Sequence, residues 1–280
     1  MNKITFLLGI HNHQPIGNFD EVFEEAYRKS YKPFMEVLWR HPAVKWNLHC
    51  TGILWDWLAA HHADYLDRAR EMAARGQVEL LSGGFYEPIL AILPDADKIG
   101  QIQKLSRFIE THFGTKPQGM WCAERVWEPH LPKPIREAGI EYTVLDDTHF
   151  LSAGLTKEQL SGYYKVEEQG LALDVFPISQ DLRYLIPFSK PEDSIDFMKK
   201  SAQSWRGGVR PALVMADDGE KFGLWPKTFE LVYEEGWLEK FLTLIEKNSD
   251  WLETATFAEF RKNNRAVGRT YLPTASYFEM

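Results

Sequence analysis

The chain has 280 residues, a length that allows one large domain with a sizeable hydrophobic core. Its formal net charge is −8 and its basic residues form no cluster, which argues against nucleic acid as a partner. No run approaches the roughly 18 apolar residues that a membrane span requires, so we expect no membrane partner.

The first half of the chain alternates apolar strands with amphipathic helices. Residues 4–10 form a continuous apolar run, typical of a strand buried on both faces, and no signal-peptide cleavage site follows it. Helical periodicity covers residues 21–39, and a second amphipathic helix over 54–74 ends at Gly76. The other elements predicted in this half are strands at 44–48, 78–81, 119–122 and 142–145 and helices at 95–113 and 131–138.

The second half is less regular at its start. Between about residues 148 and 188 we predict a strand at 173–176 and another near Tyr184. A helix at 191–204 and a strand at 212–215 follow, and residues 229–245 are largely helical with a break near Gly236. The tail from Tyr271 to Met280 carries no capping element.

Strands that alternate with helices at this spacing predict a parallel sheet, and the number of strands favours closure into a barrel over an open sheet. In both architectures the loops that follow the strands build the site. Five polar residues follow predicted strands and are expected on one rim: His13, Glu87, Glu124, Asp146 and Asp218. We see no internal repeat or linker, so residues 1–280 are expected to form a single domain.

Cysteine and aromatic content narrow the function only in part. Cys50 and Cys122 are the two cysteines, with no disulfide framework or zinc-binding spacing, and reduced thiols fit a cytoplasmic protein. Catalysis by Cys122 is the weaker alternative, because a lone cysteine is usually structural. The 10 tryptophans belong either to a Trp-rich core or to platforms that stack on sugars.

Two segments rich in aromatic residues each carry a carboxylate after a predicted strand. Glycoside cleavage needs two carboxyl groups that face each other across one bond. In the first segment Glu124 lies between Trp121 and Trp127, and the guanidinium of Arg125 would favour the ionised form that a nucleophile requires. The plain alternative is an ordinary Glu–Arg pair on the surface.

The second segment offers two adjacent carboxylates, Asp217 and Asp218, which point in opposite directions on an extended backbone. Asp218 precedes Gly219, and the nearby Phe222 and Trp225 can exclude water from it. Desolvation raises the pKa of a carboxyl group, as a general acid requires, so we predict that Asp218 is the acid. The alternative is a common Asp-Gly turn.

A polar cluster is predicted after the first and third strands. His11 and His13 are two residues apart and point the same way on a strand, a geometry that suits a metal ion. The further ligands of a zinc site are missing, so we predict no metal and assign both imidazoles to sugar hydroxyls or to orienting a carboxylate. Glu87 occupies a glycine-rich turn and is either a binding or supporting residue or a solvated carboxylate.

Three further polar residues follow the fifth predicted strand. Asp146, Asp147 and His149 either line the pocket or cap the next segment, and we assign them no chemistry.

Five short strings, taken together and in order, resemble those of glycoside hydrolase family 57, and the likeness is closest to its 4-α-glucanotransferase (amylomaltase-like) branch. Any one string would be weak evidence, whereas five in order are specific. They are His-Asn-His-Gln-Pro at 11–15, Gly-Phe-Tyr-Glu-Pro at 84–88, Trp-Cys-Ala-Glu-Arg-Val-Trp at 121–127, Asp-Asp-Gly-Glu-Lys-Phe-Gly at 217–223 and Ala-Ser-Tyr-Phe-Glu-Met at 275–280.

The resemblance implies a distorted, TIM-like (β/α)7 barrel and a retaining mechanism without metal or other cofactor. It implies Glu124 as nucleophile and Asp218 as acid/base, with their carboxyl groups about 5–6 Å apart. The residues expected to bind glucan are His11, His13, Glu87, Trp121 and Trp225. Members of the branch continue into helical and β-sandwich regions, so we expect residues 1–280 to be the catalytic barrel alone.

The reaction expected from this resemblance is transfer of maltooligosaccharide segments between α-1,4-glucan chains. The nearest alternative is an α-amylase-type hydrolase with the same two carboxylates. A metal-dependent polysaccharide deacetylase is a more distant alternative. Enzymes of that class have an Asp-Asp pair after the first strand and a downstream His-x-x-x-His motif, whereas in this chain the Asp-Asp pair comes late and the histidine motif is missing. A non-catalytic glucan-binding fragment is the third alternative.

Overall fold

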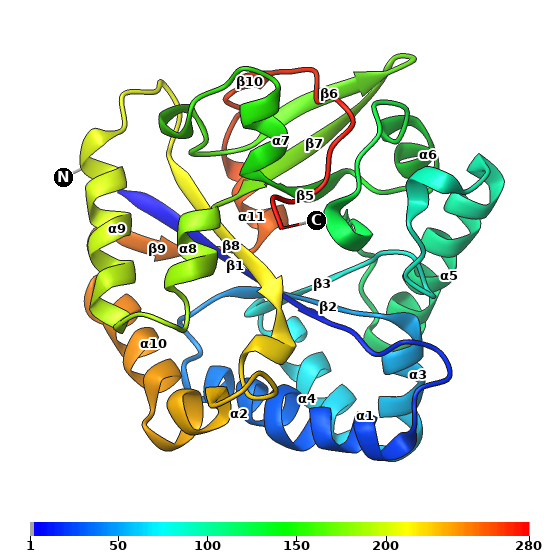
Figure 1. The fold of residues 1–280 in the computed structure, drawn as a ribbon, viewed down its shortest axis with the longest axis vertical. Helices are drawn as coiled ribbons and strands as arrows, with labels where there is room; N and C mark the ends of the chain where they lie inside the picture. The colour runs from blue at the N-terminus through cyan, green and yellow to red at the C-terminus, as the bar shows by residue number, and fades with distance from the viewer. Residues whose placement is uncertain (1–2, 280) are drawn as a thin grey trace.

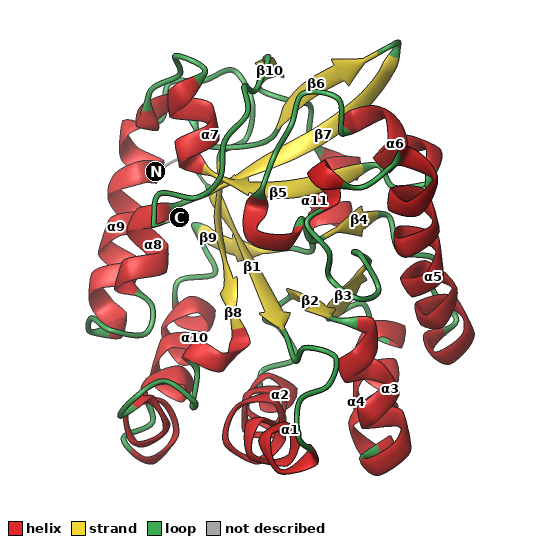
Figure 2. Cartoon of the chain, turned by 45° about the vertical axis from the view of Figure 1, so that its right-hand side comes forward, coloured by secondary structure: helices red, strands yellow, loops and turns green. Residues whose placement is uncertain are grey.

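The structure is a computed structural model, and it describes residues 3–279. Strands occupy the interior and helices surround them (Figures 1 and 2). The strands are β1 (Ile4–Asn12), β2 (Trp46–Cys50), β3 (Val78–Leu81), β4 (Gly119–Met120), β5 (Tyr142–Asp146), β6 (Tyr164–Glu168), β7 (Leu171–Ile178), β8 (Ala212–Asp218), β9 (Leu252–Thr254) and β10 (Gly268–Arg269).

Most helices lie in the connections between successive strands. They are α1 (Asp20–Ala26), α2 (Lys32–Arg40), α3 (Gly52–His61), α4 (Ala63–Ala74), α5 (Asp95–Phe113), α6 (Pro132–Glu137), α7 (Asp147–Ser152), α8 (Gln180–Leu185), α9 (Pro191–Ser204), α10 (Trp237–Lys247) and α11 (Phe257–Asn263). Two π-helical segments, Tyr27–Tyr31 and Glu230–Glu234, adjoin α2 and α10. No helix within residues 3–279 is long and apolar enough to cross a bilayer.

Seven parallel strands form the ring of a distorted barrel. β1 pairs with β2 and β8, β2 pairs with β3, and β5 pairs with β4 and β7. Single residue pairs complete the ring: Ile178 with Val214 between β7 and β8, and Ser82 with Met120 between β3 and β4. Because these two joints have no continuous ladder, the barrel is not evenly closed, which confirms the expected distorted (β/α)7 architecture.

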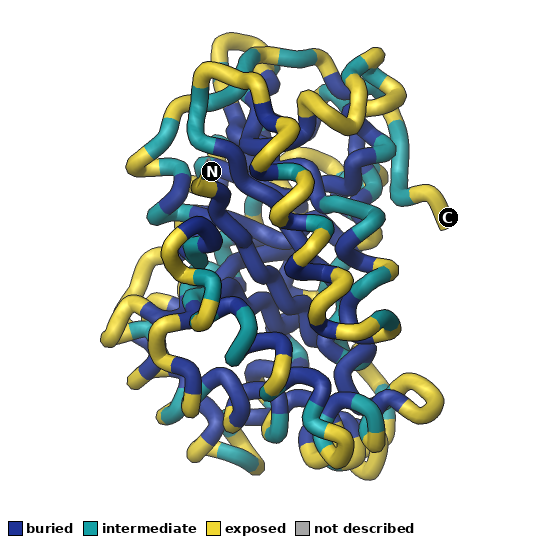
Figure 3. Tube along the Cα trace, turned by 90° about the vertical axis from the view of Figure 1, so that its left-hand side faces the viewer, coloured by how far each residue is buried: buried dark blue, intermediate teal, exposed yellow. Residues whose placement is uncertain are grey.

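The core lies between the ring and its helices. All nine residues of β1 are buried, as its unbroken apolar run predicts for a strand covered on both faces. Figure 3 shows this buried interior, with exposed positions on the outer sides of the helices and in the loops. Because the seven strands are parallel, their carboxyl ends meet on one rim, where the candidate site residues lie.

Most predicted elements are confirmed, and some bounds agree to the residue, as for β3, α5 and α9. One long helical prediction is interrupted: the helix predicted at 54–74 is divided at His62 into α3 and α4. The break predicted near Gly236 is confirmed, because Gly236 takes a left-handed φ of 73° before α10. A left-handed backbone angle ends a helix at little cost when the residue is glycine.

The predicted strand near Tyr184 is wrong, because this residue lies in α8. The side chain of Ser179 accepts a hydrogen bond from the backbone N–H of Leu182 and caps the start of that helix. Tyr184 is an exposed ring on this short helix. The elements that the sequence pattern missed are β6, β9, β10, α7 and α11.

Candidate active site

A cavity of about 430 Å³ opens at the rim where the barrel strands end. It is lined by His11, Trp121, Glu124, Arg125, Arg183, Tyr184, Phe188, Asp217, Asp218, Lys221, Trp225, Tyr277 and Glu279. The structure therefore brings five predicted site residues to one place, including both catalytic candidates. A larger cavity, of about 600 Å³, lies around Arg261, but there the carboxylates of Asp174 and Glu259 are paired with basic side chains.

Glu124 stands in a strained turn directly after β4. Its backbone has a left-handed φ of 51° and ψ of 14°, and Arg125 also has a positive φ of 48°. Such angles are uncommon outside glycine and cluster at functional sites. The turn exposes Glu124 to the cavity between buried neighbours, and Ser276 Oγ donates a hydrogen bond of 2.9 Å to its backbone oxygen.

The partner of Arg125 differs from the sequence-based expectation. Its Nε lies 2.9 Å from Asp146 Oδ2, and both side chains are almost fully buried. The guanidinium also lies over the rings of Trp121 and Tyr277, at 5.3 Å and 4.2 Å from their centroids. Arg125 therefore stabilises the turn through an ion pair with Asp146. From the sequence we had expected this guanidinium to lie beside Glu124 instead.

Asp217 is held in a buried ion pair. Its Oδ2 lies 2.6 Å from Lys221 Nζ and 3.2 Å from Arg183 Nε. Burial alone would raise the pKa of Asp217, but the charges of Lys221 and Arg183 lower it below its ordinary value. Asp217 is therefore an ionised anchor, which is unsuited to donating a proton.

Asp218 has the opposite environment. Burial raises the pKa of its carboxyl group, and the negative charge of Asp217 adds to the rise, while the charge of His11 opposes it. His11 lies opposite Asp218 in the register between β1 and β8. A carboxyl group that keeps its proton more readily than its neighbour has the property that general acid catalysis requires.

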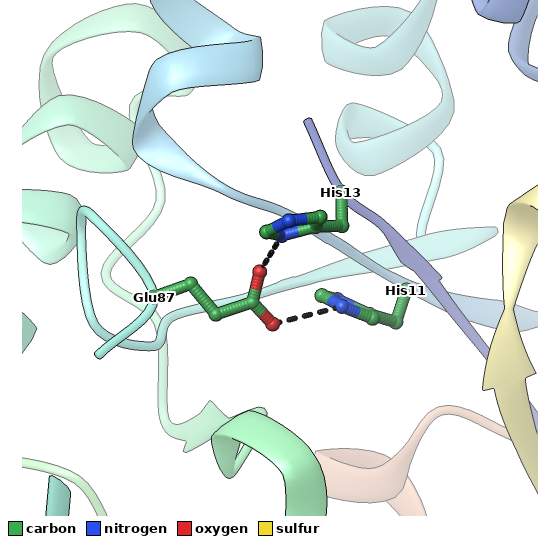
Figure 4. Close-up of side chains that lie close together, drawn as sticks. All are labelled: His11, His13 and Glu87. Atoms are coloured by element: carbon green, nitrogen blue, oxygen red, sulfur yellow. Dashed lines mark hydrogen bonds and ion pairs between the residues drawn. The ribbon is translucent and has the colours of Figure 1, made fainter. Parts of the chain in front are cut away.

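Glu87 joins the two predicted histidines (Figure 4). His11 Nε2 lies 2.9 Å from Glu87 Oε1, and His13 Nδ1 bonds the other carboxylate oxygen. Burial by itself would raise the pKa of Glu87, but the two imidazoles hold it well below its ordinary value. His13 and Glu87 are not among the residues lining the cavity, so both act behind His11, which lines it.

His11 is fixed on its other sides as well. Its ring stacks on Trp121, with centroids 4.6 Å apart and planes 12° apart, and its Nδ1 lies 2.7 Å from Nδ1 of His49. Burial would lower the pKa of His11, yet the charge of Glu87 raises it above its ordinary value. Burial lowers the pKa of His49 well below its ordinary value, so His49 is the neutral acceptor of this pair.

The same cluster is the part of residues 3–279 where three potential metal ligands converge. The ligand atoms of His11, His13 and Glu87 lie within 4.8 Å of one another and could hold a divalent ion. Both oxygens of Glu87 are already engaged by the imidazoles, so the cluster is satisfied by hydrogen bonds alone. That the chemistry requires no metal stays a prediction.

The site includes residues that the sequence analysis did not single out. Arg183 pairs with Asp146 and Asp217 and approaches Glu279 at 3.6 Å. Glu220 accepts a hydrogen bond of 3.0 Å from the backbone N–H of His13. The signal for Glu220 was present in its string beside Asp217 and Asp218, whereas Arg183 carries no local signal.

The residues after β5 have structural contacts. Asp146 bridges the two arginines described above, and Asp147 Oδ2 accepts a hydrogen bond of 3.2 Å from the backbone N–H of Gln180. His149 Nε2 lies 2.8 Å from the backbone oxygen of Arg125. These residues therefore connect segments around the cavity through hydrogen bonds and ion pairs, and that they take no part in the chemistry stays a prediction.

Comparison with known proteins finds relatives along the whole chain. The protein described as Alpha-amylase 1 of Dictyoglomus thermophilum is 53% identical over 278 residues, covering 99% of this chain and 40% of that protein. The 4-alpha-glucanotransferase of Thermococcus litoralis is 47% identical over 280 residues, covering 100% of this chain and 42% of that protein. The chain therefore spans about two fifths of the length of these relatives.

Solved structures and a family model agree with these relatives. The crystal structure of the T. litoralis enzyme superposes with a TM-score of 0.96, over 100% of this chain and 43% of that one. A branching enzyme from Pyrococcus horikoshii, 17% identical, shares the fold with a TM-score of 0.73 over 98% of this chain and 73% of that one. The model described as Glycosyl hydrolase family 57 matches residues 7–273, and the chain belongs to that family.

Proposed function

We propose that this chain carries the active site of a retaining enzyme that acts on α-1,4-glucan, with Glu124 as nucleophile and Asp218 as acid/base. The observation that carries the proposal is that one cavity is lined by both carboxylates, and that only Asp218 of the adjacent pair has a raised pKa. The relatives named 4-alpha-glucanotransferase and alpha-amylase support the substrate class.

In the first step a carboxylate oxygen of Glu124 bonds to the anomeric carbon while the glycosidic C–O bond breaks. Asp218 gives its proton to the departing oxygen, so the leaving sugar is released neutral. In the second step Asp218 takes the proton of an incoming hydroxyl, whose oxygen displaces Glu124 from the same carbon. Two displacements retain the configuration.

The surrounding groups support this sequence of steps. His11 presents a fixed ring to the cavity, and Glu87 keeps it in place with the help of His13. Trp121 lines the cavity as well, but it is 2% exposed and stacks on His11, so it supports the imidazole ring. Binding through imidazole, carboxylate and ring faces suits the hydroxyls and apolar faces of glucose. A cytoplasmic location, the absence of a cofactor and the absence of nucleic-acid and membrane partners remain part of the proposal.

The identity of the second acceptor decides between two outcomes of the same chemistry. A sugar hydroxyl gives transfer, as in a 4-α-glucanotransferase, and water gives hydrolysis, as in an α-amylase. The relative at 53% identity is named alpha-amylase, which keeps hydrolysis as the second candidate.

The test is the product profile from maltotriose, measured with the chain and with Glu124→Gln. Transfer yields glucose together with a ladder of longer oligomers, whereas hydrolysis yields glucose and maltose alone. Glu124→Gln should yield neither, because an amide cannot form the glycosyl ester. A folded Glu124→Gln protein with more than a small fraction of the original rate would refute the assignment of the nucleophile.

A further inference from the structure

Two exposed aromatic rings line the same cavity as Asp218. Phe188 follows α8 and Trp225 follows the turn Gly219–Lys221, and their ring centroids are 6.0 Å apart with planes 13° apart. Phe188 is 49% exposed and Trp225 is 39% exposed. Large aromatic side chains bury most of their surface when the fold allows it, so this near-parallel pair presents an apolar surface to a ligand.

A buried cation holds this surface in place. Lys221 Nζ lies 5.2 Å from the centroid of Phe188 and 5.9 Å from that of Trp225, within the range of cation–π attraction. The side chain of Lys221 is 2% exposed, and its ammonium group also pairs with Asp217 at 2.6 Å. One fixed charge therefore ties the two rings to the residue that precedes the candidate acid.

The position of the rings relative to Asp218 indicates which part of a glucan they meet. The general acid lies against the oxygen of the leaving sugar, so that sugar occupies the side of the cavity nearest Asp218. The acceptor enters the same space in the second step. Lys221, which lies three residues after Asp218, contacts both rings and pairs with Asp217, whereas Glu124 follows a different strand, β4.

We propose that Phe188, paired with Trp225, is a stacking platform for the glucosyl residue of the acceptor, and that it thereby sets the ratio of transfer to hydrolysis. The inference rests on the proposed function. A pyranose places its C–H face on the rings and so directs its hydroxyl toward Asp218. Water has no such face and is not bound by the two rings, so the rings favour a sugar acceptor over water. The acceptor hydroxyl passes its proton to Asp218, its oxygen bonds to the anomeric carbon, and the ester bond to Glu124 breaks.

The test uses a maltosyl fluoride donor with and without added maltotriose as acceptor. Fluoride is a small leaving group that needs neither a proton nor a sugar platform, so its release reports the first step. We expect Phe188→Ala to lower the ratio of transfer to hydrolysis about tenfold, which corresponds to about 1.4 kcal/mol. The rate of fluoride release should change far less than this ratio.

Two further variants separate stacking from general damage. Phe188→Tyr keeps an aromatic face and should retain most of the transfer. Phe19→Ala removes a ring that is 74% exposed at the start of α1, outside the cavity, and should leave the ratio unchanged. All variants are compared in the chain as it exists, with thermal unfolding measured for each.

Three results would overturn the inference. A transfer ratio for Phe188→Ala equal to that of the unmodified chain would remove the platform role. A Phe188→Tyr protein as impaired as Phe188→Ala would show that the ring face is not what matters. Absence of fluoride release from the unmodified chain would instead remove the proposed function, on which the platform depends, so the two failures are distinguishable.

Discussion

Asp217 and Asp218 are adjacent in sequence but differ in the charges around them. Asp217 is paired with two buried cations, and Asp218 is desolvated beside a second carboxylate. The sequence favoured Asp218 because Gly219 follows it and because Phe222 and Trp225 could exclude water from it. The structure shows a further role for this glycine: a Cβ there would collide with Asn12 Oδ1, so any side chain at position 219 would have to displace Asn12 of β1.

The first prediction separates these two carboxylates. Asp218→Asn should lose most of its activity on maltooligosaccharides, because the leaving oxygen no longer receives a proton. It should keep much of its first step on a glycosyl fluoride, whose leaving group needs none. Asp217→Asn should lose less activity on natural glucan. Rates on both substrates measure the difference, and the reverse ranking would show that the wrong member of the pair is assigned as acid.

A second prediction concerns Asp217 and acid stability. Because the pKa of Asp217 is lowered in the folded state, its ion pair stabilises the protein above the ordinary carboxyl pKa of about 3.9. That contribution is lost as the pH falls through the folded-state value. Asp217→Asn should therefore unfold at a lower temperature near pH 7 and show a flatter loss of stability below pH 4. Unfolding temperatures between pH 3 and 7 provide the measurement; parallel curves would contradict it.

At the scale of elements, a buried line of alternating charges connects the loops that carry the two candidate carboxylates. It runs from Arg125 after β4, through Asp146 at the end of β5 and Arg183 in α8, to Asp217 in β8 and Lys221 beyond it. Their side chains are 10% exposed or less. The line spans the joint between β7 and β8, where only one residue pair joins the strands.

The third prediction tests this line with two arginines of similar geometry. Arg183→Met should lower both the unfolding temperature and the turnover rate, because loss of one partner from a buried ion pair typically costs about 3–5 kcal/mol. The charge of Arg183 lowers the pKa of Asp218, so its removal should raise that pKa. The alkaline limb of the rate profile, where the acid loses its proton, should then move to higher pH.

Arg261 is the matched control, since it also bridges two carboxylates, Asp174 and Glu141, but away from the cavity. Arg261→Met should lower the unfolding temperature without moving the alkaline limb. If both variants shift the alkaline limb of the rate profile equally, the effect of Arg183 comes from general stability. If neither variant shifts it, Arg183 does not influence the pKa of Asp218.

These elements also mark how far sequence reasoning reaches. Long periodic segments such as α5 and α9 follow from local apolar spacing, and their bounds were predicted. The short helix α8 was misread as a strand and β6 of the β6–β7 hairpin was missed, because both are short and lack a long periodic pattern. Arg183 was missed for another reason, because its partners lie 37 and 34 residues away. Glu87 and Glu124 were found because they follow strands.

At the scale of the whole molecule, the fold brings both candidate carboxylates to one cavity at the rim where the parallel strands end. The cluster of His11, His13 and Glu87 lies at this rim, where His11 lines the cavity, and it has the composition of a metal site. Its carboxylate is nevertheless already bonded by both imidazoles. A requirement for a metal ion in catalysis therefore distinguishes a metal-dependent deacetylase from a glycosidase.

The fourth prediction follows from that contrast. Exhaustive chelation should leave cleavage of maltooligosaccharides unchanged, because in the proposed mechanism Glu124 supplies the nucleophile and Asp218 supplies the proton. Activity is measured before and after chelation, and again after zinc is added back. Loss of activity that zinc specifically restores would favour the deacetylase interpretation.

The left-handed backbone at Glu124 implies that thermal stability is reduced at the position where the candidate nucleophile is needed. A non-glycine residue in this conformation typically costs about 1–3 kcal/mol, and the fold accepts the cost to aim one carboxylate into the cavity. Glu124→Gly should therefore yield an inactive protein that melts at a higher temperature than the original, whereas Glu124→Ala, inactive too, should not gain. Selection for thermal resistance alone would then favour glycine at position 124, so the glutamate persists there only while its chemistry is used.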